Sequence, residues 1–266
     1  MPKKRHFIRL RLGRMFYSCK RYLLWVFGGL KFAAGRSDSG GFTCEYFSHQ
    51  TPLLRKLKGA DMYLQHNKIT NLRIAVSRIN GVTVHPGETF SFWKLVGKPT
   101  KAKGYLNGMV LKNGTPVAGI GGGLCQLSNL IYWMTLHTPL TVTERHRHGF
   151  DVFPDSDRTQ PFGSGATCFY NYGDLMIKNN TNQPFKLRLD VGENNLTGAW
   201  AALTPPVYRY EVYEKDHVIQ SYRGRYTRHN RIFRKIYNED NKLTADEFVA
   251  ENHAVMMYEP LLPTKA

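Results

Sequence analysis

The sequence predicts an α+β fold, mostly antiparallel sheet with two main helices. Two segments show the 3.6-residue apolar period of helices, whereas most of the chain beyond residue 140 forms short β-like segments separated by turn residues. With 266 residues, 42% of them hydrophobic, the chain is long enough to bury a sizeable core. It contains no run of about 20 apolar residues, which excludes a conventional multi-span membrane protein.

The first 36 residues carry ten Lys and Arg, no acid, and much of the net charge of +17. Arginines and aromatic residues alternate from Arg9 to Phe27, which favours a basic amphipathic segment on an anionic membrane surface. An uncleaved export anchor and a soluble basic tail are the alternatives, and no clear cleavable signal peptide is present. We expect residues 1–36 to form a membrane-associated leader, the side of the membrane being unknown.

A linker at 37–42 precedes the first helix, which we expect from residue 62 to residue 79 with Asp61 as its cap. Turn residues at Pro86-Gly87 and Asn113-Gly114 predict hairpins over 82–93 and 105–117. A Gly-rich stretch at 119–123 opens the second helix, expected from about 124 to 137. The β-like segments that follow are 140–144, 150–153, 166–172, 174–178, 185–191 and 197–203.

After Pro205-Pro206 the pattern predicts further strands over 207–238 and a short helix over 245–252. We therefore divide the chain into a basic leader (1–36), a core domain (43–204) and a C-terminal β-rich extension packed on the core (207–258).

Cys125 lies where the Gly-rich stretch meets the second helix. The unpaired N–H groups and the positive dipole end of a helix N-terminus favour a thiolate, which is the nucleophilic form of cysteine. The same N–H groups can stabilise an oxyanion, with Gln126 as a further donor. A buried structural cysteine in a Gly-rich turn is the alternative.

Two histidines follow on the next predicted strand, where His146 and His148 share a face with Glu144. A cysteine that begins a helix, with a histidine on a following strand, is typical of papain-like peptidases and predicts an acyl-enzyme mechanism. Both histidines are candidate general bases, and ordinary surface histidines are the alternative. A zinc site formed by Cys125, His146, His148 and Cys168 matches no common spacing, so we predict no metal and no other cofactor.

We do not expect nucleic acid to be a partner. A second basic run lies at Arg223, Arg225, Arg228, Arg231, Arg234 and Lys235, but no nucleic-acid motif accompanies it, and charge alone gives salt-sensitive, non-specific affinity.

The chain resembles the VanW family, proteins found with vancomycin-resistance genes, from about Phe47 to Tyr258. The matching segments are Asn67 with Asn71, residues 85–93 (HPGETFSFW), 103–105 (KGY), 121–126 (GGGLCQ), Glu144 with His148, and 172–174 (YGD) with 179–181 (NNT). The glycine-cysteine-glutamine motif is the most specific. The segment 226–233 (YTRHNRIF) is similar to the resistance-associated branch.

The resemblance implies a cell-wall protein and, since some VanW domains are assigned as L,D-transpeptidases, a cysteine acyl-enzyme. Cys125 would then be the nucleophile and His148, before His146, the general base. Gly149 stands where the family usually has serine. Gly165 stands where the family often has aspartate. If that aspartate orients the histidine, the role is vacant or passes to Asp151 or Asp174.

We therefore expect a VanW-like protein associated with glycopeptide resistance, acting as a transpeptidase-like enzyme on peptidoglycan stem peptides or lipid-linked precursors. The candidate substrate-binding residues are Gly121, Gly122, Gly123, Arg145 and Asp174. The alternative is a non-catalytic module that binds such a precursor or a membrane partner.

Overall fold

A computed structural model describes residues 2–36, 40–54, 61–112, 114–152, 160–222 and 224–260. Its elements are α1 (Pro2–Phe27), β1 (Cys44–Pro52), α2 (Met62–Ile79), β2 (Thr83–Val84), β3 (Thr89–Ser91), α3 (Phe92–Val96), the 3-10 helix η1 (Lys101–Lys103), β4 (Asn107–Lys112), β5 (Thr115–Ile120), α4 (Cys125–Leu136), β6 (Thr141–Glu144), β7 (Phe150–Asp151), β8 (Met176–Lys178), β9 (Phe185–Val191), β10 (Asn195–Ala202), β11 (Arg209–Tyr222), β12 (Arg225–Tyr237) and β13 (Leu243–Met256). The class is α+β and mostly antiparallel, as predicted.

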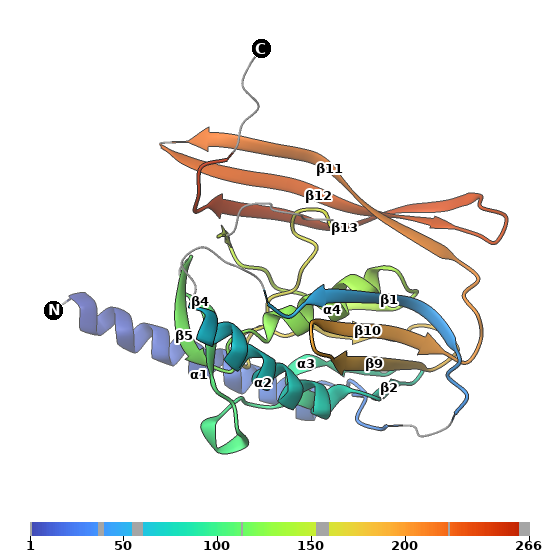
Figure 1. The fold of residues 1–266 in the computed structure, drawn as a ribbon, viewed down its shortest axis with the longest axis horizontal. Helices are drawn as coiled ribbons and strands as arrows, with labels where there is room; N and C mark the ends of the chain where they lie inside the picture. Colours follow the sequence, from blue (N-terminus) through green and yellow to red (C-terminus); the bar gives the residue numbers. More distant parts are fainter. Residues whose placement is uncertain are drawn as a thin grey trace, which may run out of the picture.

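The core is built from α2 and α4 packed against a sheet in the order β1-β10-β9-β2 (Figure 1). Both helices place apolar residues at helical spacing on their buried faces, which is the period that predicts them. Trp200 of β10 is fully buried and donates its indole N–H to Thr135 Oγ1 of α4 at 3.1 Å. This contact fixes α4 on the sheet.

Several predicted boundaries agree with the structure. The helices α2 and α4 lie where the sequence places them, and β4 and β5 form the predicted hairpin, of which residue 113 lies outside the described residues. Asp61 occupies the N-cap position of α2, but its side chain makes no capping hydrogen bond. Residues 37–39 of the predicted linker and residue 153 of a predicted strand also lie outside the described residues.

Three predicted elements are wrong. The segment 82–93 is not a hairpin, because β2 pairs with β9 whereas β3 pairs with β8 in a separate β3-β8-β6 sheet. The segment 166–172 forms only an isolated bridge between Phe169 and Gly173. The segment 245–252 is part of β13, whose pairing with β12 over eleven register positions outweighs its local helix propensity.

The C-terminal strands β11, β12 and β13 form a second layer, above the core in Figure 1, to which β7 adds a short parallel pairing. Arg234 of β12 ties this layer to the core, since its guanidinium donates to Leu136 O and Thr138 O at the end of α4. A cation beside the last carbonyls of a helix also complements the helix dipole.

The leader is a long helix, α1, whose C-terminal half packs against the core. Beyond it, Ala33 N donates to Thr89 O at 3.0 Å and Thr83 N donates to Gly35 O at 3.0 Å, so residues 31–36 run beside β2 and β3. Ala33 itself is buried in the core. The leader is therefore an integral part of the packed structure.

Candidate functional site

Cys125 is the first residue of α4, and its side chain is partly exposed. Burial raises the pKa of the Cys125 thiol, although hydrogen bonds from the backbone N–H groups of Cys168 and of Cys125 itself act in the opposite direction. The helix dipole alone predicts a lowered pKa for this thiol, which is the opposite direction. The resting thiol is therefore protonated near neutral pH.

The segment 166–168 lies against the first turns of α4. Ser128 Oγ donates to Ala166 O at 2.6 Å, and Asn129 Oδ1 accepts the Ala166 N–H at 2.8 Å. On the other side, Thr167 N donates to His146 O at 2.8 Å. One short segment thus connects the cysteine helix to the histidine segment, and Cys168 is a neighbour of Cys125.

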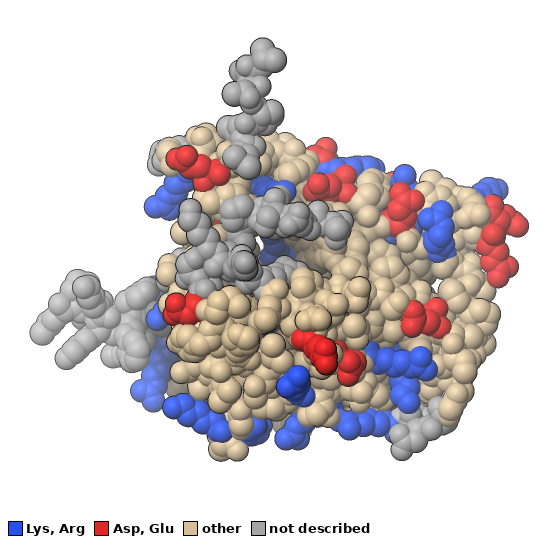
Figure 2. Space-filling model, in the orientation of Figure 1, with Lys and Arg blue, Asp and Glu red and all other residues tan. Residues whose placement is uncertain are grey.

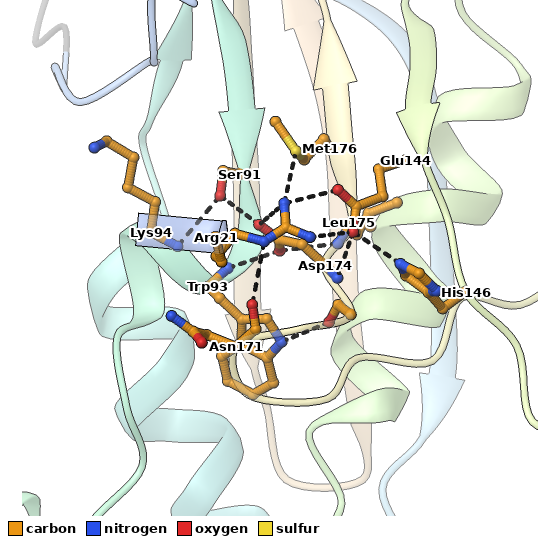
Figure 3. A network of polar contacts seen from close by, with 11 residues as sticks. Arg21, Ser91, Trp93, Lys94, Glu144, His146, Asn171, Asp174, Leu175 and Met176 are labelled. Carbon is orange, nitrogen blue, oxygen red and sulfur yellow. Dashed lines mark hydrogen bonds and ion pairs between the residues drawn. The ribbon is translucent and has the colours of Figure 1, made fainter. Parts of the chain in front are cut away.

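His146 is held by Glu144, whose Oε1 lies 2.8 Å from His146 Nε2 (Figure 3). Glu144 is the last residue of β6, and the chain beyond it is irregular, so the predicted common face for both histidines does not extend to His148. His148 packs edge-on against Phe169 at 5.4 Å, and burial, with a smaller effect of Arg147, lowers its pKa. Among the described residues, no hydrogen bond joins Cys125 Sγ to His146 or His148.

The predicted orienting acids have other partners. Asp151 pairs with Arg228 at 3.4 Å and accepts the Tyr258 hydroxyl at 2.9 Å, which ties β7 to the C-terminal layer. At position 165, where the family often has aspartate, an added Cβ would lie 2.7 Å from Asn129 Oδ1. The carboxylate that holds a histidine here is Glu144.

Asp174 is fully buried, and both of its carboxylate oxygens are occupied. They accept Ser91 Oγ–H at 2.5 Å and the backbone N–H groups of Trp93 and Leu175 at 2.9 Å, which fixes the start of α3. Burial raises the pKa of Asp174 to about 6, and these hydrogen bonds oppose the shift. These hydrogen bonds give Asp174 a structural role, and its contact with substrate stays a prediction.

Arg145 also has a structural role, and its contact with substrate stays a prediction. Its guanidinium donates to Gly163 O, to Gly165 O and to Asn252 Oδ1, and it stacks over Tyr132 at 4.9 Å. It therefore joins α4, the loop at 163–165 and β13. Gln126 likewise donates its amide to Thr51 Oγ1 and Pro52 O, both at 2.9 Å, so this amide does not act as the predicted oxyanion donor in the resting structure.

The glycines at 121–123 are packed against protein and do not line an open site. A Cβ on Gly122 would lie 2.2 Å from the carbonyl carbon of Gly108, and one on Gly123 would lie 2.1 Å from Lys68 Cγ. Asn71 of α2 donates to Gly122 O at 2.9 Å. These close approaches explain the glycines and fix the loop that leads into Cys125.

Arg21 of α1 is a member of this site that sequence reasoning missed. Its guanidinium forms a bidentate pair with Glu144, donates to Asn171 O at 3.1 Å and lies 4.0 Å from Asp174 (Figure 3). Burial opposes ionisation of Glu144, but hydrogen bonds from His146 and Arg21 hold its pKa at about 2. Nothing in the sequence separates Arg21 from the other basic residues of the leader.

Within the described residues, no group of three metal-ligating side chains is suitably placed for a metal ion. The second basic run is largely neutralised, because Arg228 pairs with Asp151, Arg231 with Asp216 and Arg234 with Glu247. Arg223 lies outside the described residues. These ion pairs give no support to a nucleic-acid site.

Residues 67–201, just over half of the chain, match the sequence model of the family described as VanW like protein. The chain belongs to the VanW family. It is 35% identical over 169 residues to the Vancomycin B-type resistance protein VanW of Enterococcus faecalis, covering 64% of this chain and 59% of that protein. It is 31% identical over 118 residues to YoaR of Bacillus subtilis, covering 44% of this chain and 37% of that protein.

The VanW-family chain thus spans about three fifths of the enterococcal relative. No solved structure matches it significantly. The family match includes Cys125, Glu144, His146 and His148 but excludes Arg21 and the C-terminal layer.

Proposed function

We propose that this VanW-family protein takes part in glycopeptide resistance, as the name of its enterococcal relative states for that protein, and that it transfers acyl groups on peptidoglycan stem peptides or their lipid-linked precursors. The observation that supports acyl transfer is the position of the Cys125 sulfur at the start of α4, beside two backbone N–H groups. Such groups can bind the oxyanion of a tetrahedral intermediate.

In the proposed reaction, an imidazole takes the thiol proton as the Cys125 sulfur attacks a stem-peptide carbonyl. The C–S bond forms, the C–N bond breaks, and the proton leaves with the amine. An acceptor amine then attacks the thioester and restores the thiol. Because the resting thiol is protonated, the base must act once the substrate is bound.

His146 is the better candidate base, in place of His148. Glu144 holds His146 through Nε2, which is the orienting role that a third group has in a cysteine-histidine site. The His146 side chain is 41% exposed, whereas His148 is packed against Phe169.

A non-catalytic module that binds a cell-wall precursor is the second candidate. The lack of a sulfur–imidazole hydrogen bond and the raised pKa of Cys125 favour it. In that case Cys125 and its neighbours keep the loop packed, and the protein holds the precursor for another enzyme.

A transfer assay with Cys125→Ala tests the proposal. Purified protein is incubated with a stem tetrapeptide donor and an amine acceptor, and products and thioester are measured by mass spectrometry. We expect the parent protein to form both and Cys125→Ala to form neither, a loss of at least about a thousandfold. The matched control Cys19→Ala, at an exposed position of α1, should retain full activity.

Equal product from Cys125→Ala and the parent would refute acyl transfer through this sulfur. If the folded parent forms no thioester or product but binds the tetrapeptide in calorimetry, the binding-module candidate is supported instead.

A further inference from the structure

The helix α1 has two faces of opposite character. Arg21, on one face, is only 7% exposed and lies among Glu144, Asp174 and Asn171. On the same side, Trp25 packs against the core. On the other face, large apolar side chains point away from the protein: Leu12 (59% exposed), Phe16 (65%), Leu23 (57%), Val26 (68%) and Phe27 (78%).

The exposed apolar residues form one continuous stripe. From Leu12 they recur at i, i+4, i+11, i+14 and i+15, and the exposed Cys19 fills the i+7 position. At 3.6 residues per turn these positions share one side of a helix over about four turns. Arg21 is nine residues after Leu12, or two and a half turns, and therefore lies on the opposite side.

Cations flank this stripe. Arg9, Arg11 and Lys20 are exposed, and α1 contains no acidic residue. Lys and Arg side chains also follow much of the lower edge of the molecule in Figure 2. A matching surface must therefore be both apolar and anionic.

We propose that the outward face of α1 lies in the headgroup region of an anionic lipid bilayer. The stripe enters the acyl-chain boundary, and the flanking cations contact lipid phosphates. In this arrangement α1 lies along the membrane surface. None of the helices in the described part of the chain is long and apolar enough to span a bilayer. The inference is independent of the proposed acyl transfer.

A second copy of the chain fits this face less well. Two such helices packed along their stripes would bring two sets of cations together with no acidic side chain on either helix to offset them. Anionic lipid supplies the opposite charge and the apolar phase in one surface. The bidentate pair of Arg21 with Glu144 then holds the whole protein at a fixed orientation to the bilayer.

Flotation of the full-length protein with vesicles tests the proposal. We expect binding to vesicles of phosphatidylglycerol and phosphatidylcholine, and at least tenfold weaker binding to pure phosphatidylcholine. The triple variant Leu12→Glu, Leu23→Glu, Phe27→Glu should lose binding, and Arg9→Gln with Arg11→Gln should weaken it about 25-fold. Val207→Glu, at an exposed apolar position outside α1, is the matched control and should bind as the parent does.

We expect every variant to fold, because none of these substitutions lies on the Arg21 face of α1. Circular dichroism and thermal melting check this. Binding of the triple variant at the parental level would overturn the proposal, and so would absence of binding by the folded parent. A parental dimer that the triple variant dissociates, without vesicle binding, would identify a second copy as the occupant and also overturn it.

Discussion

Glu144 has three partners that come from different parts of the chain. It binds the guanidinium of Arg21, the imidazole of His146 and the backbone N–H of Asp174. Its pKa of about 2 lies below the ordinary 4.5, so ionised Glu144 stabilises the fold above pH 4.5, and this contribution is lost as the pH falls from 4.5 towards 2.

Replacing Arg21 by Met should therefore destabilise the protein in a pH-dependent way. At pH 7 it leaves the Glu144 and Asp174 carboxyl groups without their cation, and we expect a loss of about 3 kcal/mol. Urea unfolding at pH 7 and pH 3.5 measures the difference. The loss should shrink at pH 3.5, where Glu144 becomes protonated in the variant; an equal loss at both values would contradict the ion-pair account.

Individual site residues were predictable to different degrees. The sequence places Cys125 at a helix start correctly, because the Gly-rich stretch and the apolar period are local signals. It does not predict the direction of the thiol pKa shift, because burial of the sulfur in the folded structure causes that shift and leaves no local signal in the sequence. The structural roles of Arg145 and Asp174 were not predictable for the same reason, since their partners come from distant loops and strands.

At the scale of elements, the loop that leads into α4 depends on a contact between two backbones. Gly122 and Gly108 are so close that neither position has room for a Cβ. Asn71 of α2 also donates to Leu106 O and accepts the Leu106 N–H at the start of the β4–β5 hairpin. Hairpin, loop and α2 are thus held as one unit.

Gly122→Ala should disrupt this unit, because its Cβ would meet backbone atoms that cannot move independently. We expect a loss of about 2–3 kcal/mol in free energy of unfolding, measured by urea denaturation. Gly149→Ala is the matched control, since nothing lies within 4 Å of a Cβ there, and it should change stability by less than about 0.5 kcal/mol. Equal stability of the two variants would contradict this explanation of the loop.

Elements with strong periodicity were predictable, and short or pairing-dependent ones were not. The period of 3.6 identifies α2 and α4 because both bury one face against a sheet. The strands β2 and β3, of two and three residues, carry no signal for which strand they pair with. The segment 166–172 reads as a strand, yet α4 side chains and the His146 carbonyl take its backbone hydrogen bonds.

At the scale of the whole molecule, the leader and the C-terminal layer both complete the core. Removing residues 1–30 would take away Arg21 and Trp25 together, so we expect a fall in melting temperature of about 6–12 °C, in line with a loss of about 3 kcal/mol. Removal of residues 1–11 alone should leave the melting temperature nearly unchanged, because the half of α1 that packs against the core remains. Thermal melts followed by circular dichroism compare the two; similar values would show that α1 adds no stability.

The pairing of β1 with β10 has a practical consequence for work on the isolated family region. The stretch from 67 to 201 begins inside α2, one turn after its start, and ends one residue before the end of β10. A recombinant fragment cut at these limits would leave the long edge of β10 bare, from Asn195 to Ala201, with its N–H and C=O groups open to any other strand. We expect such a fragment to aggregate. Fragments made for expression should therefore retain β1 and the strands beyond Pro205.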